Sequence, residues 1–490
     1  MEQTKILFLC KGEYRYFFPQ LVRVLRDEHG LRPSAIAFNT PSAEMLEKSG
    51  AFDLVYNLAD HIKRRIAGLT ASRALELLEK FEVMPGAVNI SLMVAADRII
   101  SRYRFDLVVK VMAAILDFWQ ELFTNDPPNV ILGEVACAAE WMGWTVARQR
   151  RIPQIIPYPP SVARRMLFID SPTGSWEAMA ERFEAARSRQ LTAEETARAE
   201  EFLQRFRQGC TRATYLSAIR ASPARLWHPH QLLPRLGRIG FRLRAWWEDG
   251  FAEVGSYHGT PPWEPIAHDI ARPLRHLASE ICLLGKRIPE GKKLFFALHV
   301  QPEFTVNIRA PFHDNQIALV ESIAKSMPVG YRLAVKEHPG MKGERSIGYY
   351  RQLRAPYNVD LLSPAVGSHE LIRQSDAVLT ITGSVAWEAI LFEKPVVAFG
   401  PLCYDFYDPI FRCRDVSELP KLLPEVLKRF KPDHGLVLRL VNALLESAYE
   451  GEWDVPLRTA SAGSPENYRR VAHAIARETA FRLERHQRSA

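Results

Sequence analysis

The chain has 490 residues, which is too long for a single hydrophobic core, so we expect two or more domains. Hydrophobic residues make up 47% of it and charged residues 24%, a composition that excludes a largely disordered protein. The 64 basic residues outnumber the 56 acidic ones, giving a net charge of +8. This excess predicts an anionic partner: nucleic acid, a phosphorylated small molecule or anionic lipid.

The sequence carries no pattern typical of an export signal or a membrane-spanning helix. No apolar stretch reaches the roughly 18–20 residues that a span requires, and a strand-like run begins at Lys5. The six cysteines are scattered, without a CxxC pair or zinc-ligand spacing. We therefore expect a cytoplasmic protein with reduced thiols, no metal site and no cofactor.

Strand and helix patterns alternate through residues 1–191. Strand-like runs occur at 5–10, 34–38, 54–56, 130–132 and 154–156, with helical patterns between them. This alternation predicts a parallel sheet covered on both faces, that is, a Rossmann-like domain.

Two acidic residues of this first domain directly follow predicted strands. Glu13 comes after the run 5–10, and Glu134 comes after the run 130–132 and Gly133, which would allow a ligand to approach closely. Either carboxylate could act as a general base in a cleft. A structural or substrate-orienting role stays open for both.

The pattern changes over residues 192–287, where helical character replaces the alternation. Between residues 220 and 247 no acidic residue occurs, while arginines interleave with aliphatic and aromatic residues, including Trp246 and Trp247. We interpret 220–247 as a surface for the anionic inner membrane, with an ordinary interdomain helix as the alternative. Nucleic-acid binding is least favoured, and no nucleic-acid partner is expected. Because Pro234 interrupts the pattern, a regular helix is predicted only from about Leu236.

Alternation resumes in a second predicted Rossmann-like domain over residues 288–420, followed by a helical tail over 421–490. Its strand-like runs lie at 294–298, 331–335, 359–362, 377–380 and 395–399. Two such domains facing a cleft would bring together the loops at the carboxyl ends of both sheets, where phosphate-bearing ligands usually bind.

The first of three polar loops in this domain follows the run 294–298. It contains His299, Gln301 and Glu303, which could line a donor or acceptor pocket. A surface loop with a structural histidine is the alternative.

The second polar loop follows the run 331–335. Lys336 and His338 are two residues apart, so in an extended chain both would emerge on one side and could meet a phosphate. Pro339 favours an extended conformation for His338. An ordinary surface loop is again the alternative.

The third polar loop joins a buried strand directly to a helix through Thr382, Gly383 and Ser384. Hydroxyl groups and the free backbone N–H groups at the helix start could bind a phosphate there. Glu388 lies one turn further along and could accept hydrogen bonds from ribose hydroxyls. The alternatives are an ordinary helix cap and a solvated glutamate.

Several enzyme classes lose support because their motifs are missing. The sequence contains no GxxxxGK[ST] loop, GxGxxG fingerprint, HExxH pair or GxSxG elbow. Kinase, dehydrogenase, zinc-protease and hydrolase functions are therefore not favoured.

Taken together, the segments 298–303, 314–316, 335–339 and 382–396 resemble the capsule polysaccharide biosynthesis protein family. Its better-understood members are GT-B-fold glycosyltransferases that build bacterial surface glycans, including ones that use CMP-activated Kdo. The resemblance covers about residues 293–400, whereas the first domain is similar only in its general layout.

The resemblance implies a role for each motif residue. Lys336 and His338 would contact the donor phosphate. The residues that would bind the nucleotide are Thr382, Gly383, Ser384 and Glu388. An acidic residue of the first domain would deprotonate the acceptor, but no aspartate there matches a motif of the Kdo-transferring members.

The sequence thus predicts a GT-B-like protein with two Rossmann-like domains, a helical insertion and a helical tail. We expect an inverting, metal-independent glycosyltransferase that moves a sugar from a nucleotide-activated donor, CMP-linked and Kdo-like, to a glycan or glycolipid acceptor of surface polysaccharide. It would be cytoplasmic and peripheral on the inner membrane. The alternatives are a UDP-sugar 2-epimerase-like or glycerophosphotransferase-like enzyme, and an inactive membrane-associated scaffold of polysaccharide assembly or export.

Overall fold

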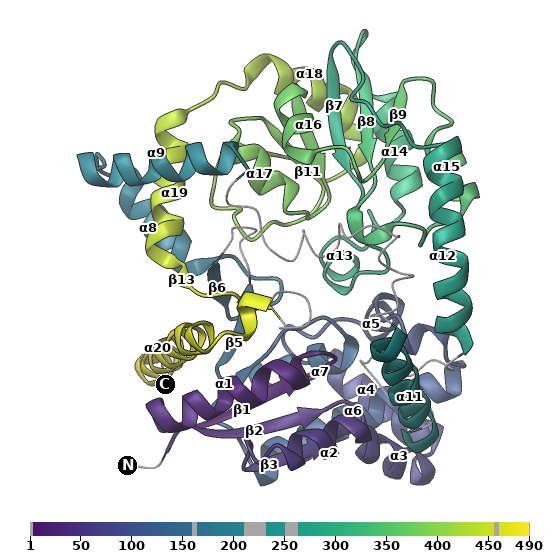
Figure 1. Ribbon diagram of the computed structural model, residues 1–490, viewed down its shortest axis with the longest axis vertical. Coiled ribbons are helices and arrows are strands. Elements are labelled where there is room, and N and C mark those ends of the chain that lie inside the picture. The colour runs from purple at the N-terminus through teal and green to yellow at the C-terminus, as the bar shows by residue number, and fades with distance from the viewer. Residues whose placement is uncertain (1–2, 159–163, 210–231, 250–262, 455–459, 490) are drawn as a thin grey trace.

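The computed structural model describes residues 3–158, 164–209, 232–249, 263–454 and 460–489. Its two β-sheets are flanked by helices, and they lie in the lower and upper halves of Figure 1. The predicted mixed α/β class with two parallel-stranded sheets and a helical tail is confirmed. Within the described ranges, each helix is too short or too polar to cross a membrane.

The first sheet is built around five parallel strands in the order β5-β4-β1-β2-β3. Two short antiparallel strands, β6 and β13, extend it at the β5 edge. The strands are β1 (Lys5–Cys10), β2 (Arg32–Ala37), β3 (Leu54–Asn57), β4 (Val130–Leu132), β5 (Gln154–Tyr158), β6 (Arg165–Ile169) and β13 (Tyr449–Glu450). The five predicted runs are confirmed with small shifts of their ends, whereas β6 and β13 were not predicted.

Helices connect the parallel strands, as parallel pairing requires. They are α1 (Tyr14–His29), α2 (Thr40–Lys48), α3 (Leu58–Gly68), α4 (Ala71–Glu82), α5 (Ile90–Ala96), α6 (Phe105–Asn125) and α7 (Ala138–Gln149), with the short 3₁₀ helix η1 (Ile100–Arg102) before α6. The long helix α6 is apolar on most sides and packs against α3, α4 and α7, so it forms the centre of this core.

The second sheet has six parallel strands in the order β12-β11-β10-β7-β8-β9. This is the strand order of a doubly wound sheet, whose ligands bind beyond the carboxyl ends of the strands. The strands are β7 (Lys293–Ala297), β8 (Arg332–Lys336), β9 (Val359–Leu362), β10 (Ala377–Thr380), β11 (Val396–Ala398) and β12 (Ile410–Arg412). The helices are α13 (Phe304–Arg309), α14 (Gln316–Lys325), α15 (Ile347–Leu353), α16 (Ser368–Gln374) and α17 (Val385–Leu391), with the 3₁₀ helices η4 (Pro339–Met341) and η5 (Val416–Glu418).

Helices alone make up the described part of the segment between the sheets from α8 onward. They are α8 (Glu177–Arg187), α9 (Ala193–Arg207), α11 (Leu232–Asp249) and α12 (Trp263–Cys282). The predicted start of α11 near Leu236 is wrong, because the helix begins at Leu232. Pro234 is tolerated there, since in the first turn a backbone N–H has no partner within the helix.

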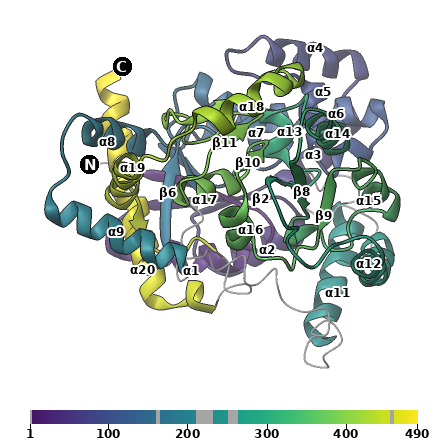
Figure 2. The ribbon, with the colours of Figure 1, turned by 90° about the horizontal axis from the view of Figure 1, so that it is seen from above.

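The tail runs back across both halves of the molecule. It contains α18 (Leu419–Arg429), α19 (His434–Ser447), β13, the 3₁₀ helix η6 (Ala460–Gly463) and α20 (Pro465–Ser489). Helix α19 packs on α8 and α9, whereas α20 packs on α1 (Figures 1 and 2).

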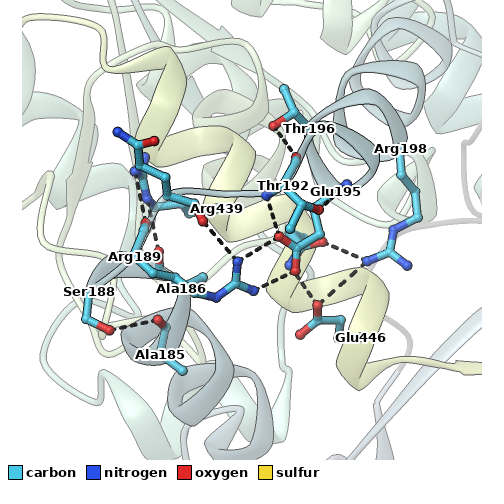
Figure 3. Close-up of polar contacts among 12 residues, drawn as sticks. Ala185, Ala186, Ser188, Arg189, Thr192, Glu195, Thr196, Arg198, Arg439 and Glu446 are labelled. Carbon is cyan, nitrogen blue, oxygen red and sulfur yellow. Dashed lines mark hydrogen bonds and ion pairs between the residues drawn. The ribbon is translucent and has the colours of Figure 1, made fainter.

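Polar contacts hold α19 to the α8–α9 pair (Figure 3). Arg439 donates to the carbonyl oxygens of Ala186 and Arg189, while Arg198 donates to the side chain of Asn442 at 2.7 Å. Helix α9 itself begins with a reciprocal capping box between Thr192 and Glu195. The buried residues of α9 are Ala199, Leu203 and Phe206, and the helix packs against α19 of the tail.

Gly143 provides a test of the packing between α6 and α7. A Cβ atom on Gly143 would lie 2.3 Å from the ring of the buried Trp119. We expect Gly143→Ala to lower the free energy of unfolding by about 3 kcal/mol, although alanine favours a helix over glycine. Urea denaturation checks this result.

The matched control is Gly68→Ala at the exposed end of α3, where an added Cβ meets no atom within 4 Å. It should change the free energy of unfolding by less than about 0.5 kcal/mol. Equal effects of the two substitutions would contradict the packing described here.

Candidate functional site

The three predicted polar loops meet at the carboxyl ends of the adjacent strands β10, β7 and β8. His299 follows β7, His338 follows β8 and Thr382 follows β10. Because parallel strands end at one edge of a sheet, these loops become neighbours although more than 80 residues of sequence separate His299 from Thr382.

His299 links two of these loops from a buried position. Its Nε2 atom accepts a hydrogen bond from the backbone N–H of Thr382 at 3.3 Å and lies 3.2 Å from Oγ1 of Thr380. Gln316 accepts from the His299 backbone N–H and donates to its carbonyl oxygen. Burial, together with the positive charge of Arg345 and the nearby His338, lowers the pKa of His299 to about 3. The neutral ring therefore positions the loops, and the expectation that His299 lines a pocket is revised.

The loop at residues 382–384 uses its first backbone N–H groups internally. Thr382 donates to His299, and the N–H of Gly383 donates to Oγ1 of Thr380 at 3.0 Å. A Cβ on Gly383 would lie 2.8 Å from Nε2 of His299, so glycine is what lets the loop close. The backbone N–H groups of Thr382 and Gly383 are therefore not available to a phosphate in this conformation, and phosphate binding by the N–H groups at the start of α17 stays a prediction. Ser384, at the N-cap of the short helix α17, is exposed and makes no side-chain cap, so its hydroxyl faces solvent.

Glu388 lies one turn into α17 and is half-buried. Its carboxylate oxygen Oε2 lies 3.4 Å from Nε2 of His369 on α16. The His369 ring in turn packs against Phe206 of α9 and Phe392. A ribose contact by Glu388 remains a proposal, and it would have to share the carboxylate with His369.

Lys336 belongs to β8 rather than to the loop after it, and His338 lies in that loop. Lys336 ends β8 and is buried, and His338 has an extended backbone conformation before Pro339, which begins η4. Nδ1 of His338 accepts from the N–H of Gly340 at 3.0 Å. Burial and the charges of Lys336 and Arg345 lower the pKa of His338 to about 4. Near neutral pH the ring is thus uncharged, and its proton resides on Nε2, where it can be donated to a ligand.

Sequence reasoning missed the buried ion pair that supports these loops. Arg345 and Glu337 lie 3.0 Å apart with almost no exposure, and Arg345 also donates to the carbonyl oxygen of His299. Glu337 accepts from the backbone N–H of His338. Burial raises the pKa of Glu337, and Arg345 opposes that rise. Arg345 therefore ties the His299 loop to the His338 loop; it lies only seven residues beyond His338, but no periodic pattern marks it.

The remaining residues of the His299 loop have separate roles. The side-chain amide of Gln301 donates to the carbonyl oxygen of Asp314, which indicates a structural role. Glu303 precedes α13, and burial raises its pKa to about 6 against the opposing charges of Arg98 and Arg309. Arg98, from the half of the chain that forms the first sheet, donates to the carbonyl oxygen of Pro302. Glu303 therefore lies where the two halves meet.

Glu13 and Glu134 lie beyond the carboxyl ends of the adjacent strands β1 and β4, as predicted. Glu134 accepts a hydrogen bond from the hydroxyl of Tyr14, and Glu13 occupies the N-cap of α1. The explanation given for Gly133 is wrong: a Cβ there would lie 2.5 Å from Cβ of Leu9, so the glycine serves strand packing rather than ligand approach.

One group of side chains within the described residues could hold a metal ion: His61, Asp117 and Glu121, on α3 and α6. Arg65 already pairs with Asp117 at 2.8 Å. The group contains none of the predicted site residues, and we assign no function to it.

Residues 289–407 match the model of a family described as "Capsule polysaccharide biosynthesis protein". The match contains all the candidate residues of the second sheet and confirms the resemblance predicted from their motifs.

Individual relatives are more distant. Protein FixF of Sinorhizobium fredii (strain NBRC 101917 / NGR234) is 27% identical over 236 residues, which cover 43% of this chain and 54% of FixF, so the match spans about half of that relative's length. Among solved structures, the beta Kdo 2,4 transferase of Thermosulfurimonas dismutans KpsC is 13% identical with a TM-score of 0.38, covering 73% of this chain and 93% of the other. The UDP-GlcNAc 2-epimerase of Methanocaldococcus jannaschii is 11% identical with a TM-score of 0.30, covering 91% and 99%.

The Arg345–Glu337 pair predicts a strong effect on stability. Arg345→Ala would leave the carboxylate of Glu337 buried without its partner, and we expect a loss of about 3–5 kcal/mol in the free energy of unfolding. Urea denaturation measures it. Arg351→Ala, at an exposed position on α15, is the control and should cost less than about 0.5 kcal/mol. A small effect of Arg345→Ala would show that the pair does not hold the loops.

Glu303 predicts a pH dependence. Its pKa is 4.5 before burial and about 6 in the folded protein, so the folded state binds the proton more tightly. The stabilisation is complete below about pH 4.5 and is lost as the pH rises through about 6. Relative to Glu303→Gln, the wild type should therefore lose about 2 kcal/mol of unfolding free energy over that interval. Parallel curves for the two proteins would contradict the assignment.

Proposed function

We propose that this protein is a glycosyltransferase of surface polysaccharide biosynthesis that takes a sugar from a nucleotide-activated donor, CMP-linked and Kdo-like, to a glycan or glycolipid acceptor. The observation that carries the proposal is the convergence of the His299, His338 and Thr382 loops at one sheet edge, inside the segment that matches the family model. That edge is where doubly wound sheets bind phosphate-bearing ligands.

The donor phosphate is the group whose charge grows as the glycosidic bond breaks. Lys336 supplies a positive charge, and neutral His338 supplies the proton on Nε2 as a hydrogen-bond donor. The hydroxyls of Thr382 and Ser384 provide further donors without requiring a backbone N–H. Donors fixed in advance toward a developing charge lower the barrier, so we propose that this site works without a metal ion.

The acceptor hydroxyl must lose a proton while the new bond forms. Glu134 is the first candidate base, with Tyr14 orienting its carboxylate, and Glu13 on the neighbouring strand is the second. Glu303 is a third, because its raised pKa makes its carboxylate a stronger base than an ordinary glutamate. Glu13 and Glu134 belong to the first sheet and the proposed donor-binding residues to the second, which suits an inverting reaction, in which donor and base lie on opposite sides of the reacting carbon.

The proposal includes a location on the cytoplasmic face of the inner membrane. Of the basic segment 220–247, residues 220–231 lie outside the described residues. In α11, Arg244 pairs with Glu44 and Glu248, and the ring of Phe241 lies under the guanidinium of Arg15. Part of this segment therefore packs helix α11 against the first sheet, while Trp247 is 82% exposed and free to meet a bilayer.

The nucleotide site is tested by donor turnover. We expect His338→Ala to lower kcat by about 100-fold, because a donor to the leaving phosphate is lost. Glu388→Ala should instead raise KM by about tenfold or more if its carboxylate binds the ribose. Product analysis with CMP-, CDP- and UDP-linked donors identifies the reaction and separates transfer from epimerisation.

The control is His473→Ala, at an exposed position on α20. It should leave turnover unchanged. If both His338→Ala and Glu388→Ala turn over the donor like the wild type, the proposed nucleotide site is refuted. A second measurement is the melting temperature of the wild type with cytidine, uridine and guanosine nucleotides. If none of them raises it, the inactive scaffold is favoured.

A further inference from the structure

The outer face of α12 is apolar although it is exposed. Leu274, Leu277 and Ile281 are 65%, 59% and 70% exposed, and their spacing of three and four residues places them on one side of the helix. Ala278 and Cys282 are exposed beside them. The result is a continuous apolar stripe along the second half of α12.

The polar residues of the same helix turn toward the protein. Arg272 and Arg275 donate to the carbonyl oxygens of Lys342 and Gly343. Glu280 accepts a hydrogen bond from Ser363 at 2.6 Å. A surface helix normally buries its apolar side and exposes its charges, so α12 has the reverse arrangement. Such an exposed apolar stripe marks an interaction surface.

Positive charge surrounds the carboxyl end of this stripe. Arg354 donates to the carbonyl oxygen of Cys282, and Lys286 and Arg287 follow a few residues beyond the helix. These three side chains and that of Arg351 on the adjacent helix α15 are exposed, and none forms an ion pair with another described residue. Apolar side chains bordered by unpaired basic groups complement the acyl and headgroup layers of an anionic bilayer.

Helix α11 adds to the same edge of the molecule, as Figures 1 and 2 both show. It exposes Leu243 and Trp247, one turn apart, with exposures of 47% and 82%. Tryptophan favours the boundary between headgroups and acyl chains. Two neighbouring helices therefore carry exposed apolar residues of the kinds found in interfacial membrane helices.

We propose that the outer face of α12 docks on the surface of an anionic lipid bilayer, with Leu274, Leu277 and Ile281 at the acyl boundary and the basic residues on the headgroups. This inference deepens the membrane location within the proposed function and rests on it, and it assigns the main contact to a helix outside the segment 220–247.

The inner face of α12 lies directly against the candidate site. A Cβ on Gly343 would lie 2.1 Å from the carbonyl oxygen of Arg272, so the loop after η4 packs on the α12 backbone itself. That loop leads from His338 to Arg345. A bilayer bound to the outer face would thus be separated from the His338 loop by the width of one helix, roughly 10 Å, which suits a lipid-linked acceptor.

The test measures binding of the full chain to vesicles of phosphatidylglycerol and phosphatidylcholine, with phosphatidylcholine alone for comparison. We expect binding to the anionic vesicles, weakened about tenfold or more by Leu277→Glu with Ile281→Glu, because two buried apolar chains become charged. The matched control, Val83→Glu with Val329→Glu, places the same two charges at exposed apolar positions outside α12 and should bind like the wild type.

A dye on Cys282 reports the contact locally. Cys282 is an exposed cysteine, whereas Cys10, Cys137, Cys403 and Cys413 are buried, and Cys210 is replaced by serine for labelling. An environment-sensitive maleimide there should brighten and shift to the blue on anionic vesicles. The same dye on Val83→Cys, in a chain that also carries Cys282→Ser, should not.

Three outcomes overturn the inference. The Leu277→Glu, Ile281→Glu variant binds vesicles as tightly as the wild type, the wild type binds vesicles of phosphatidylcholine alone as tightly as anionic ones, or the dye on Cys282 does not change its fluorescence on anionic vesicles. If the wild type does not bind vesicles but sediments as a dimer, and the variant sediments as a monomer, the stripe is assigned to contact with a second copy of the chain. Calorimetric titration with CMP separates the two proposals. CMP binding without vesicle binding rejects only the docking, and vesicle binding without CMP binding rejects only the proposed nucleotide site.

Discussion

The candidate site depends on one buried imidazole that stays neutral. His299 can accept the N–H of Thr382 only while its Nε2 carries no proton, and burial beside Arg345 and His338 keeps it in that state. Through this bond the end of β7 holds the end of β10. The carbonyl oxygen of His299 also accepts a hydrogen bond from Arg345, which connects the loop after β8 to the same residue. Three strand ends are thereby fixed by one residue, and the exposed groups around them are presented in a defined arrangement.

The alternation of apolar runs and helical patterns predicted the five parallel strands of the first sheet and five of the six strands of the second. Most of these strands are buried on both faces and read as short continuous apolar runs. The edge strand β12 is only half-buried and was not predicted. β6 and β13 were not predicted. β13 has only two residues, and it pairs with β6 across more than 280 residues of sequence, so it has no local signal. β6 pairs with β5 after a short connection, and its buried apolar residues did offer a local signal.

The candidate site likewise contains residues that local sequence could predict and residues that it could not. His338, Lys336 and the Thr382–Ser384 turn could be found because each lies next to a strand, and topology then brings them together. The roles of His299, Gly133 and Arg345 could not be predicted, because each depends on a contact across the fold. Nε2 of His299 accepts the N–H of Thr382, and the guanidinium of Arg345 pairs with the buried carboxylate of Glu337. Gly133 is needed because a Cβ there would collide with Leu9. Sequence spacing places a residue at an edge but does not say whether it faces a ligand or the protein.

The path of the tail has a consequence for how the chain folds during synthesis. Trp453 and Tyr468 pack within 6 Å, ring to ring, against Phe17 on α1, and Val471 and Ile475 of α20 complete the same core. The apolar surface of α1 is therefore covered only after the much later residues of the tail have been synthesised. The core on one face of the β7–β12 sheet needs only the first helix of the tail, since Leu419, Leu423 and Val426 of α18 belong to it. During synthesis the amino-terminal half is the exposed one, so chaperones should engage it until α20 arrives.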